Sequence, residues 1–184
     1  LQSYIAGRWI GQQAAQQLRS AVNGQPVAST HAEAIDFAEA LQYARRTGIP
    51  ELMKLDFQQR AERLKALAKY IAANKETLYA ISAHTGATRA DSWIDIEGGA
   101  GTLSAYAGIG TNELPSGNLV HEGPALPLGK QGGFAGTHIL VPRRGLAVHI
   151  NAFNFPVWGL LEKFAPSFLA GMPCIGKPAT ATSY

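Results

Sequence analysis

The chain has 184 residues, of which 46% are hydrophobic and 16% are charged, and its formal net charge is +3. These values are typical of a globular domain and exclude a disordered chain. No apolar run reaches the length of a membrane-spanning helix, and the scattered basic residues do not favour binding to nucleic acid, so neither a membrane nor a nucleic-acid partner is expected.

The first 29 residues are predicted to form short strands joined by turns. Asn23-Gly24 is a typical hairpin turn between residues 18–22 and 27–28. From about residue 31 to residue 47 the apolar spacing predicts a helix. One face of this helix would carry Ala34, Phe37, Ala38 and Leu41.

Further helices are predicted over the middle of the chain. Asp56 and Gln59 have the spacing of a capping box, and an apolar stripe of Leu64, Leu67, Ala68 and Ile71 follows. Residues 76–84 are predicted to be helical and to end at Gly86.

Residues 88–108 are also predicted to be helical, although glycines lower the helix propensity there. Gly98, Gly99 and Gly101 indicate close packing against another backbone. Residues 112–132 contain three prolines and four glycines, which predicts a loop.

The last third of the chain changes to a strand pattern. Residues 137–142 and 145–150 are short apolar runs on either side of the turn at Arg143-Arg144. Residues 150–177 then have the pattern strand, turn, helix, turn, strand. Pro156 suits the start of this helix, which ends at Gly171 and Pro173. A βαβ unit of this kind is right-handed and places a ligand site at the carboxyl ends of its strands.

This unit resembles a known family. Asn154-Phe155-Pro156, Lys163, Pro166, Gly171 and Lys177-Pro178-Ala179 are similar to the first βαβ unit of the aldehyde dehydrogenase superfamily. The longer runs 85–99, 149–156 and 177–182 resemble, within that superfamily, the dehydrogenases of phenylacetate degradation.

The resemblance covers the whole chain and implies its fold class. The expected fold is α/β, the N-terminal portion of an aldehyde dehydrogenase fold with a Rossmann-like parallel sheet, cut after the first βαβ unit. Residues 1–144 would be the N-terminal helices and strands of the cofactor-binding half, including strands of the oligomerisation type. Residues 145–184 would be the incomplete start of the NAD(P)-binding fold.

The resemblance also implies an activity. It implies an enzyme that oxidises an aldehyde, here a ring-opened CoA semialdehyde, with NADP or NAD as hydride acceptor. It further implies a homo-oligomer built on dimers and a C-terminal hydratase domain in the parent protein. In the family the nucleophilic cysteine and the general-base glutamate lie beyond the position of residue 184. Residues 1–184 alone are therefore expected to be inactive. The alternative is a non-catalytic binding or assembly module that keeps this fold.

Asn154 is the predicted catalytic residue. A side-chain amide at a strand end can donate a hydrogen bond to a developing oxyanion, and the resemblance assigns this role to Asn154. The alternative is a turn or N-cap residue before Pro156.

The resemblance implies that the cofactor is bound by the residues around two strand ends. Lys177 would contact the adenosine ribose, or alternatively would leave the sheet toward solvent. Many NAD-preferring members carry a glutamate at the position of Thr180, so NADP is expected to be accepted or preferred. The predicted cofactor-binding residues are Lys177, Ala179, Thr180, Asn151, Phe153 and Lys163.

Several of these residues have a second interpretation. Lys163 can instead belong to a solvated helix face with Glu162. Phe153 is a candidate wall of an aldehyde tunnel, whereas Trp158 is better interpreted as a core residue. Asn151 is also a candidate for shaping the turn.

The single cysteine, Cys174, lies in the apolar run MPCIG without a neighbouring base, which favours a buried structural role over a nucleophile. One cysteine excludes an internal disulfide, and the opening LQSYIAGRWI lacks the regions of a signal peptide, so a cytoplasmic location is expected.

Two other kinds of site are disfavoured. GMPCIGKP differs at one position from a phosphate-binding P-loop, but Pro178 has no hydroxyl and the helix precedes the motif instead of following it. The five histidines are dispersed and have no metal-ligand spacing, so no metal is expected.

Overall fold

The computed structural model describes residues 1–31 and 33–184. Its strands are β1 (Ser3–Ile5), β2 (Arg8–Ile10), β3 (Ala14–Arg19), β4 (Pro26–His31), β5 (Val120–His121), β6 (Leu126–Leu128), β7 (Phe134–Gly136), β8 (Ile139–Leu140), β9 (Ala147–Ile150) and β10 (Cys174–Lys177). Its α-helices are α1 (Phe37–Tyr43), α2 (Ile49–Met53), α3 (Phe57–Ala73), α4 (Lys75–Ser82), α5 (Arg89–Asn112) and α6 (Trp158–Leu169). A π-helical turn, η1 (Ala44–Gly48), joins α1 to α2, and two 3-10 turns are η2 (Ala83–Thr85) and η3 (Thr180–Thr182).

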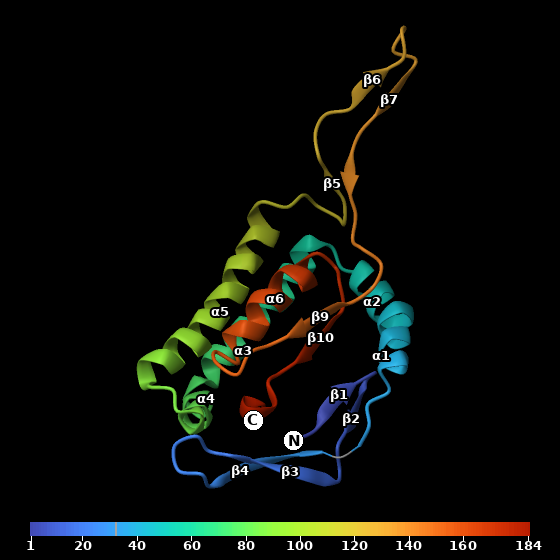
Figure 1. Cartoon of the computed structure of the whole chain (residues 1–184). Helices are drawn as coiled ribbons and strands as arrows, with labels where there is room; N and C mark the ends of the chain where they lie inside the picture. Colours follow the sequence, from blue (N-terminus) through green and yellow to red (C-terminus); the bar gives the residue numbers. More distant parts are fainter. Residues whose placement is uncertain (32) are drawn as a thin grey trace.

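The body of the molecule is a bundle of α3, α5 and α6 beside the β9–β10 pair, and an arm built from β5–β8 projects away from it (Figure 1). The two N-terminal hairpins lie at the other end of the body. None of the helices in the described part of the chain is long and apolar enough to cross a membrane.

The N-terminal strands form two antiparallel hairpins. In the β3–β4 hairpin, Leu18 lies opposite Ala28, and the chain reverses through residues 20–25. Gly24 has a φ of +70°, a left-handed conformation that favours glycine. The predicted Asn23-Gly24 turn is therefore confirmed.

The helix predicted from residue 31 to residue 47 is wrong in its first part. His31 still belongs to β4, where it lies opposite Ala14, and residue 32 is outside the described residues. The helix α1 begins only at Phe37, because the carboxylate of Asp36 accepts a hydrogen bond from the amide of Glu39 and caps the first turn. The prediction from apolar spacing did not include this local cap. The predicted face is also wrong, since Phe37 is 68% exposed and the buried residues are Ala40 and Ala44.

The predicted capping box of α3 is confirmed. The amide of Gln59 donates to Asp56 Oδ1 at 2.8 Å, and the amide of Asp56 donates to Gln59 Oε1 at 3.0 Å. The helix then packs against α5 and α6. Their shared hydrophobic core consists of Phe57, Ala61, Leu64, Ala68, Leu103, Ala107, Leu161, Ala165 and Leu169.

Helices α4 and α5 also follow the prediction. The turn η2 ends at Gly86, which has a φ of +87°, and a second capping box of Thr88 and Asp91 opens α5. On α5, a Cβ atom added to Gly99 would lie 3.2 Å from the Cα atom of Trp158, whereas one added to Gly101 would meet nothing within 4 Å. Close backbone packing is therefore confirmed for Gly99 and is wrong for Gly101.

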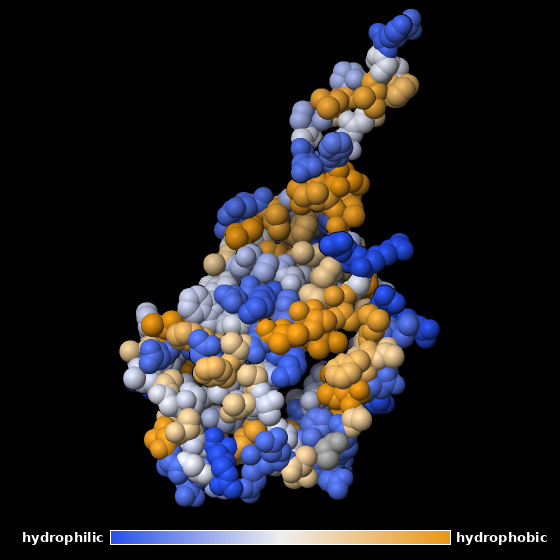
Figure 2. All heavy atoms as spheres, viewed as in Figure 1, coloured by the Kyte–Doolittle hydropathy of each residue, from blue (hydrophilic) through white to orange (hydrophobic). Residues whose placement is uncertain are grey.

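The residues predicted to form a loop, 112–132, contain two strands. β5 pairs with β8 and β6 pairs with β7, both antiparallel. The prolines and glycines of this segment suggested only turns. Its strands form because β7 and β8, later in the chain, pair with them, and the local pattern could not show this pairing. These four strands make the projecting arm, on whose surface Figure 2 shows apolar side chains over much of its length. Large exposed apolar residues of the arm and its base are Leu126, Leu128, Phe134, Ile139, Leu140 and Val141.

The predicted βαβ unit is confirmed. β9 and β10 are parallel, with Lys177 opposite Ile150, and α6 connects them. Gly171 has a φ of +80° and ends α6 just before Pro173, as expected. The unit brings the residues after Ile150 and after Lys177 to one edge of the strand pair.

Candidate active site at the strand ends

The turn between β9 and α6 carries Asn154 at this edge. Asn154 and its neighbours Phe153 and Phe155 are exposed. Phe155 has a φ of +50°, which is unusual for a bulky side chain, so the turn has a strained backbone. The Phe155 carbonyl accepts a hydrogen bond from the Gly159 amide at 2.8 Å, which joins the strained residue to the first turn of α6.

The first turn of α6 is capped by a side chain from another helix. Asp95 of α5 accepts hydrogen bonds from the Val157 amide at 3.1 Å and from the Trp158 amide at 2.7 Å through Oδ1. Asp95 is only 3% exposed. Burial raises the pKa of this carboxyl, although the two backbone bonds act in the opposite direction.

Sequence analysis did not single out Asp95. Its only signal is its position one helical turn before Gly99, where the backbones of α5 and α6 approach each other. The spacing of residues along α5 could not show that the start of α6 lies next to Asp95. The structure also shows that Asn154 is not the N-cap of α6, because that position is served by Asp95.

The side chain of Asn154 is uncommitted. Across residues 1–31 and 33–184 it makes no side-chain hydrogen bond, and it lines a cavity of about 220 Å³. The cavity walls also include Phe153, Phe155 and Asp95. A free amide beside a small cavity can donate a hydrogen bond to a ligand oxygen.

Lys177 lies at the same edge as Asn154. It is exposed at the carboxyl end of β10, and its carbonyl accepts a hydrogen bond from the Asn151 amide at 3.1 Å. After Lys177 the chain passes Ala179 and enters η3 at the exposed Thr180. Thr182 in this turn donates its hydroxyl to the Phe153 carbonyl at 2.9 Å, which ties the two strand ends together.

The predicted cofactor residues Asn151 and Lys163 lie behind this edge. Asn151 is 7% exposed and faces α6, where its Oδ1 is 3.4 Å from Lys163 Nζ. The Lys163 ammonium also donates to the Gly159 carbonyl and to Glu162. The burial of Asn151 favours its alternative interpretation, a residue that shapes the turn.

His149 completes this buried polar group. Among the residues that the structure describes, neither His149 Nε2 nor Asn151 Nδ2 has a hydrogen-bond partner. Burial lowers the pKa of His149, and the nearby Lys163 charge acts in the same direction. Both effects favour the neutral form of the His149 imidazole beneath the strand end.

The N-terminus of α6 is not available to a phosphate. In many dinucleotide folds the pyrophosphate lies against the N-terminus of the first helix, whose amides point at the anion. Here Asp95 already accepts from the amides of Val157 and Trp158. A carboxylate at this position repels a phosphate.

Cys174 does not have the properties of a nucleophile. It is half-buried in β10, and its thiol donates to the Met172 carbonyl at 3.3 Å. Burial raises its pKa to about 11, so little thiolate exists at neutral pH. No group of three or more potential metal ligands occurs in the described ranges.

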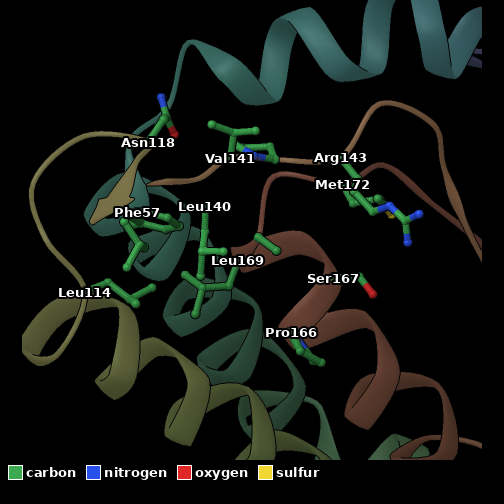
Figure 3. Close-up of a pocket in the computed structure, with 13 residues that line it drawn as sticks. Phe57, Leu114, Asn118, Leu140, Val141, Arg143, Pro166, Ser167, Leu169 and Met172 are labelled. Atoms are coloured by element: carbon green, nitrogen blue, oxygen red, sulfur yellow. The ribbon is translucent and has the colours of Figure 1, made fainter. Parts of the chain in front are cut away.

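A larger groove of about 550 Å³ lies elsewhere, between α3, the ends of α5 and α6, and the base of the arm (Figure 3). Its walls are mostly apolar and include Phe57, Leu140 and Leu169, with Arg143 also in the lining. None of its lining residues belongs to the turn at residues 151–157. The groove is therefore separate from the candidate site.

The helical bundle and the parallel β9–β10 pair define a mixed α/β protein. The model of the "Aldehyde dehydrogenase family" matches residues 9–184. The chain belongs to the aldehyde dehydrogenase family.

A curated relative is 3,4-dehydroadipyl-CoA semialdehyde dehydrogenase from Aromatoleum evansii. It is 40% identical over 188 residues, and the match covers 100% of this chain but 36% of the relative. The chain therefore spans about a third of that relative's length.

Solved structures agree on the fold. A putative aldehyde dehydrogenase from Burkholderia cenocepacia superposes with a TM-score of 0.79 at 23% identity, covering 95% of this chain and 35% of that one. An NADP-dependent enzyme from E. coli superposes with a TM-score of 0.78 at 21% identity, covering 97% and 36% of the two chains. Betaine aldehyde dehydrogenase from Staphylococcus aureus, solved with NAD⁺, has a TM-score of 0.71 at 20% identity and covers 98% and 36%. These likenesses confirm the predicted aldehyde dehydrogenase fold.

Proposed function

We propose that these residues are part of an NAD(P)-dependent aldehyde dehydrogenase, to which they contribute an oxyanion donor and part of the cofactor cleft. The observation that carries the proposal is the position of Asn154. Its amide is exposed and uncommitted, and it lies at the same edge as Lys177 in a chain of this family. The nucleophile is expected outside these 184 residues, because Cys174 is half-buried and its pKa is raised to about 11. The resemblance to the family implies the same for the general base.

The proposed role of Asn154 follows from its chemistry. When a nucleophile attacks an aldehyde, the carbonyl oxygen becomes an oxyanion, and a fixed amide stabilises that charge more in the transition state than in the ground state. Asn154 can serve because its amide is not used by the helix cap.

The cofactor is proposed to lie against the end of β10. Lys177 and Thr180 would hold the adenosine ribose, since an ammonium and a hydroxyl both suit ribose oxygens. A bound nicotinamide would supply the hydride acceptor. Thr180 has no carboxylate to repel a 2′-phosphate, so we propose that NADP is accepted or preferred.

The proposed substrate is a CoA-linked semialdehyde. The support is the name of the Aromatoleum evansii relative, which is 40% identical over the whole of this chain. The dehydrogenases of phenylacetate degradation, which the chain also resembles, would act on the same substrate class, and a panel of CoA semialdehydes would separate the two substrates.

The arm is proposed to mediate association into dimers. Its apolar residues are highly exposed, with Phe134 at 68% and Leu126 at 60%, and such patches mark interaction surfaces. Light scattering on the whole protein, with Phe134→Ser as the variant, tests this: the variant is expected to have the lower mass.

The activity is tested by aldehyde-dependent reduction of NADP and of NAD by the whole protein. Asn154→Ala is expected to lower kcat by about 10²–10³-fold, because it removes one oxyanion donor, while cofactor affinity changes little. Asn112→Ala is the matched control, since Asn112 is exposed at the far end of α5.

Two outcomes would contradict the proposal. Full activity of the Asn154→Ala variant would remove the oxyanion role. Absence of aldehyde oxidation in the whole protein, with cofactor binding retained, would instead favour a non-catalytic binding or assembly module. A strong preference for NAD would contradict only the proposed role of Thr180.

A further inference from the structure

The helix that follows Asn154 begins at a carboxylate supplied by a different helix. We propose that Asp95 is a positioning residue for Asn154: it fixes the first turn of α6 and thereby the direction of the Asn154 amide. This inference rests on the proposed oxyanion role of Asn154. It adds a residue that lies 59 positions earlier in the chain than the donor it would position.

The contacts of Asp95 locate the start of α6. Oδ1 accepts from the Trp158 amide at 2.7 Å and from the Val157 amide at 3.1 Å, and Oδ2 lies 3.3 Å from the Val157 amide. Val157 is the N-cap of α6 and Trp158 is its first residue, and amides at a helix start have no partner within their own helix. The carboxylate therefore fixes this turn against α5.

The position of the first turn is transmitted to Asn154 over a short and stiff path. Only Phe155 and Pro156 separate Asn154 from Val157. The ring of Pro156 fixes one of the few backbone dihedrals in between. Phe155 is held at a φ of +50°, a conformation that persists only when its surroundings impose it.

The other side of the turn is also fixed. Thr182 donates to the Phe153 carbonyl at 2.9 Å, and the Asn151 amide donates to the Lys177 carbonyl at 3.1 Å. The turn is thus held before Asn154 by the end of β10 and after it by Asp95. Removing either restraint leaves the strained residue free to relax, and Asn154 moves with it.

A cap made for stability alone would not need a buried charge. Asp95 is 3% exposed, and removing a carboxylate from water is costly. Water or a neutral hydroxyl or amide side chain would satisfy the same amides at lower cost. A cap from α5 has a different consequence, because it joins the turn to the helix that Gly99 allows to approach α6 closely.

The test compares Asp95→Ala with Asp56→Ala in the whole protein, because alanine removes the accepting oxygen in both cases. Asp56 caps α3 through the Gln59 amide, away from the turn. Asp95→Ala is expected to lower kcat by about 10–100-fold with KM for aldehyde and cofactor within about twofold, because a displacement of about 1 Å misaligns the donor. Asp56→Ala is expected to lower thermal stability while kcat stays unchanged.

A double variant separates positioning from a general structural effect. In the Asn154→Ala background, Asp95→Ala is expected to cause little further loss of kcat, since both changes act through one donor. Multiplicative losses would overturn the proposal, and so would wild-type kcat in Asp95→Ala. A crystal structure of Asp95→Ala gives a readout without activity: an unmoved Asn154 amide also overturns the proposal, whereas inactive wild-type enzyme contradicts the proposed function instead.

Discussion

The two ends of α6 are both held by a buried charged side chain from another helix. Asp95 of α5 accepts from the amides at the N-terminal end, and Arg60 of α3 donates from Nε to the Leu169 carbonyl at 2.8 Å at the C-terminal end. Each charge has the sign that the helix dipole favours at its end. The two ends nevertheless differ in what the charge joins.

Arg60 connects several segments, whereas Asp95 serves one turn. The Arg60 guanidinium is 0% exposed and also donates to the Leu52 and Leu55 carbonyls and to Asn118 Oδ1. Burial lowers the pKa of Arg60, yet a guanidinium stays charged at any ordinary pH. A carboxylate can be neutralised. The C-terminal end of α6 is thus built for stability, and the N-terminal end for the geometry of the turn before it.

Replacing Arg60 is expected to have the largest effect on stability. Arg60→Met would leave the Leu52, Leu55 and Leu169 carbonyls without their donor and lower the free energy of unfolding by about 3–5 kcal/mol. Urea unfolding measures this loss. Arg63→Met, an exposed position on the same helix, should stay within about 0.5 kcal/mol of wild type. Equal midpoints for the two variants would refute the role assigned to Arg60.

The glycines of α5 that face the two ends of α6 give a graded comparison. A Cβ atom added to Gly110 would lie 2.7 Å from Leu169 Cδ1 and 3.3 Å from the Phe57 carbonyl oxygen, whereas one added to Gly99 would lie 3.1 Å from Leu161 Cδ1. Gly110→Ala is therefore expected to cost about 2–3 kcal/mol and Gly99→Ala about 1 kcal/mol.

Gly101→Ala is the control for this series. A Cβ atom there would meet nothing within 4 Å, so the higher helix propensity of alanine should stabilise the protein by about 0.5–1 kcal/mol. Thermal unfolding of the three variants measures the order. A destabilising Gly101→Ala, or a harmless Gly110→Ala, would contradict the packing of α5 on α6.

The pH dependence at Asp95 is expected to be the smallest effect. Burial raises the pKa of Asp95 in the folded state above its unfolded value of about 3.9. The folded state then binds more protons than the unfolded state between these two pKa values, so the contribution of Asp95 is full below the unfolded pKa and is lost as pH rises through the folded pKa.

This sign is measured as the difference in unfolding free energy between wild type and Asp95→Asn, followed by urea unfolding from acid to neutral pH. Wild type should lose stability relative to the variant as pH rises. If the unfolding free energy of wild type minus that of the variant stays constant or increases with pH, the pKa of Asp95 is not raised.

Much of the candidate site was predictable because its signals are local. The Asn154-Phe155-Pro156 turn, the strand that ends at Lys177 and the termination at Gly171 lie within one βαβ unit, and the structure shows that unit. The identification of the family from these residues is confirmed by the family match over residues 9–184. The roles of Asn154, Lys177 and Thr180 remain predictions, since they depend on ligands.

Other features were wrong or overlooked because they depend on partners distant in the sequence. The strands β5 and β6 exist because residues 134–140 pair with them, while their prolines and glycines alone suggested a loop. The burial of Asn151 depends on α6 covering that face of β9, which its own neighbours in the sequence do not show.

The sequence by itself determined the cap of α3, the βαβ unit and the family, because a capping box, apolar periodicity and turn residues act within a few positions of one another. Only the tertiary structure decided that Asp95 caps α6 and that Arg60 closes its other end. The physical reason is that a buried charge is stable only where partners from other segments meet it, and Val157 lies 62 positions after Asp95 in the chain. The local sequence pattern does not show that two segments so far apart in the chain lie side by side.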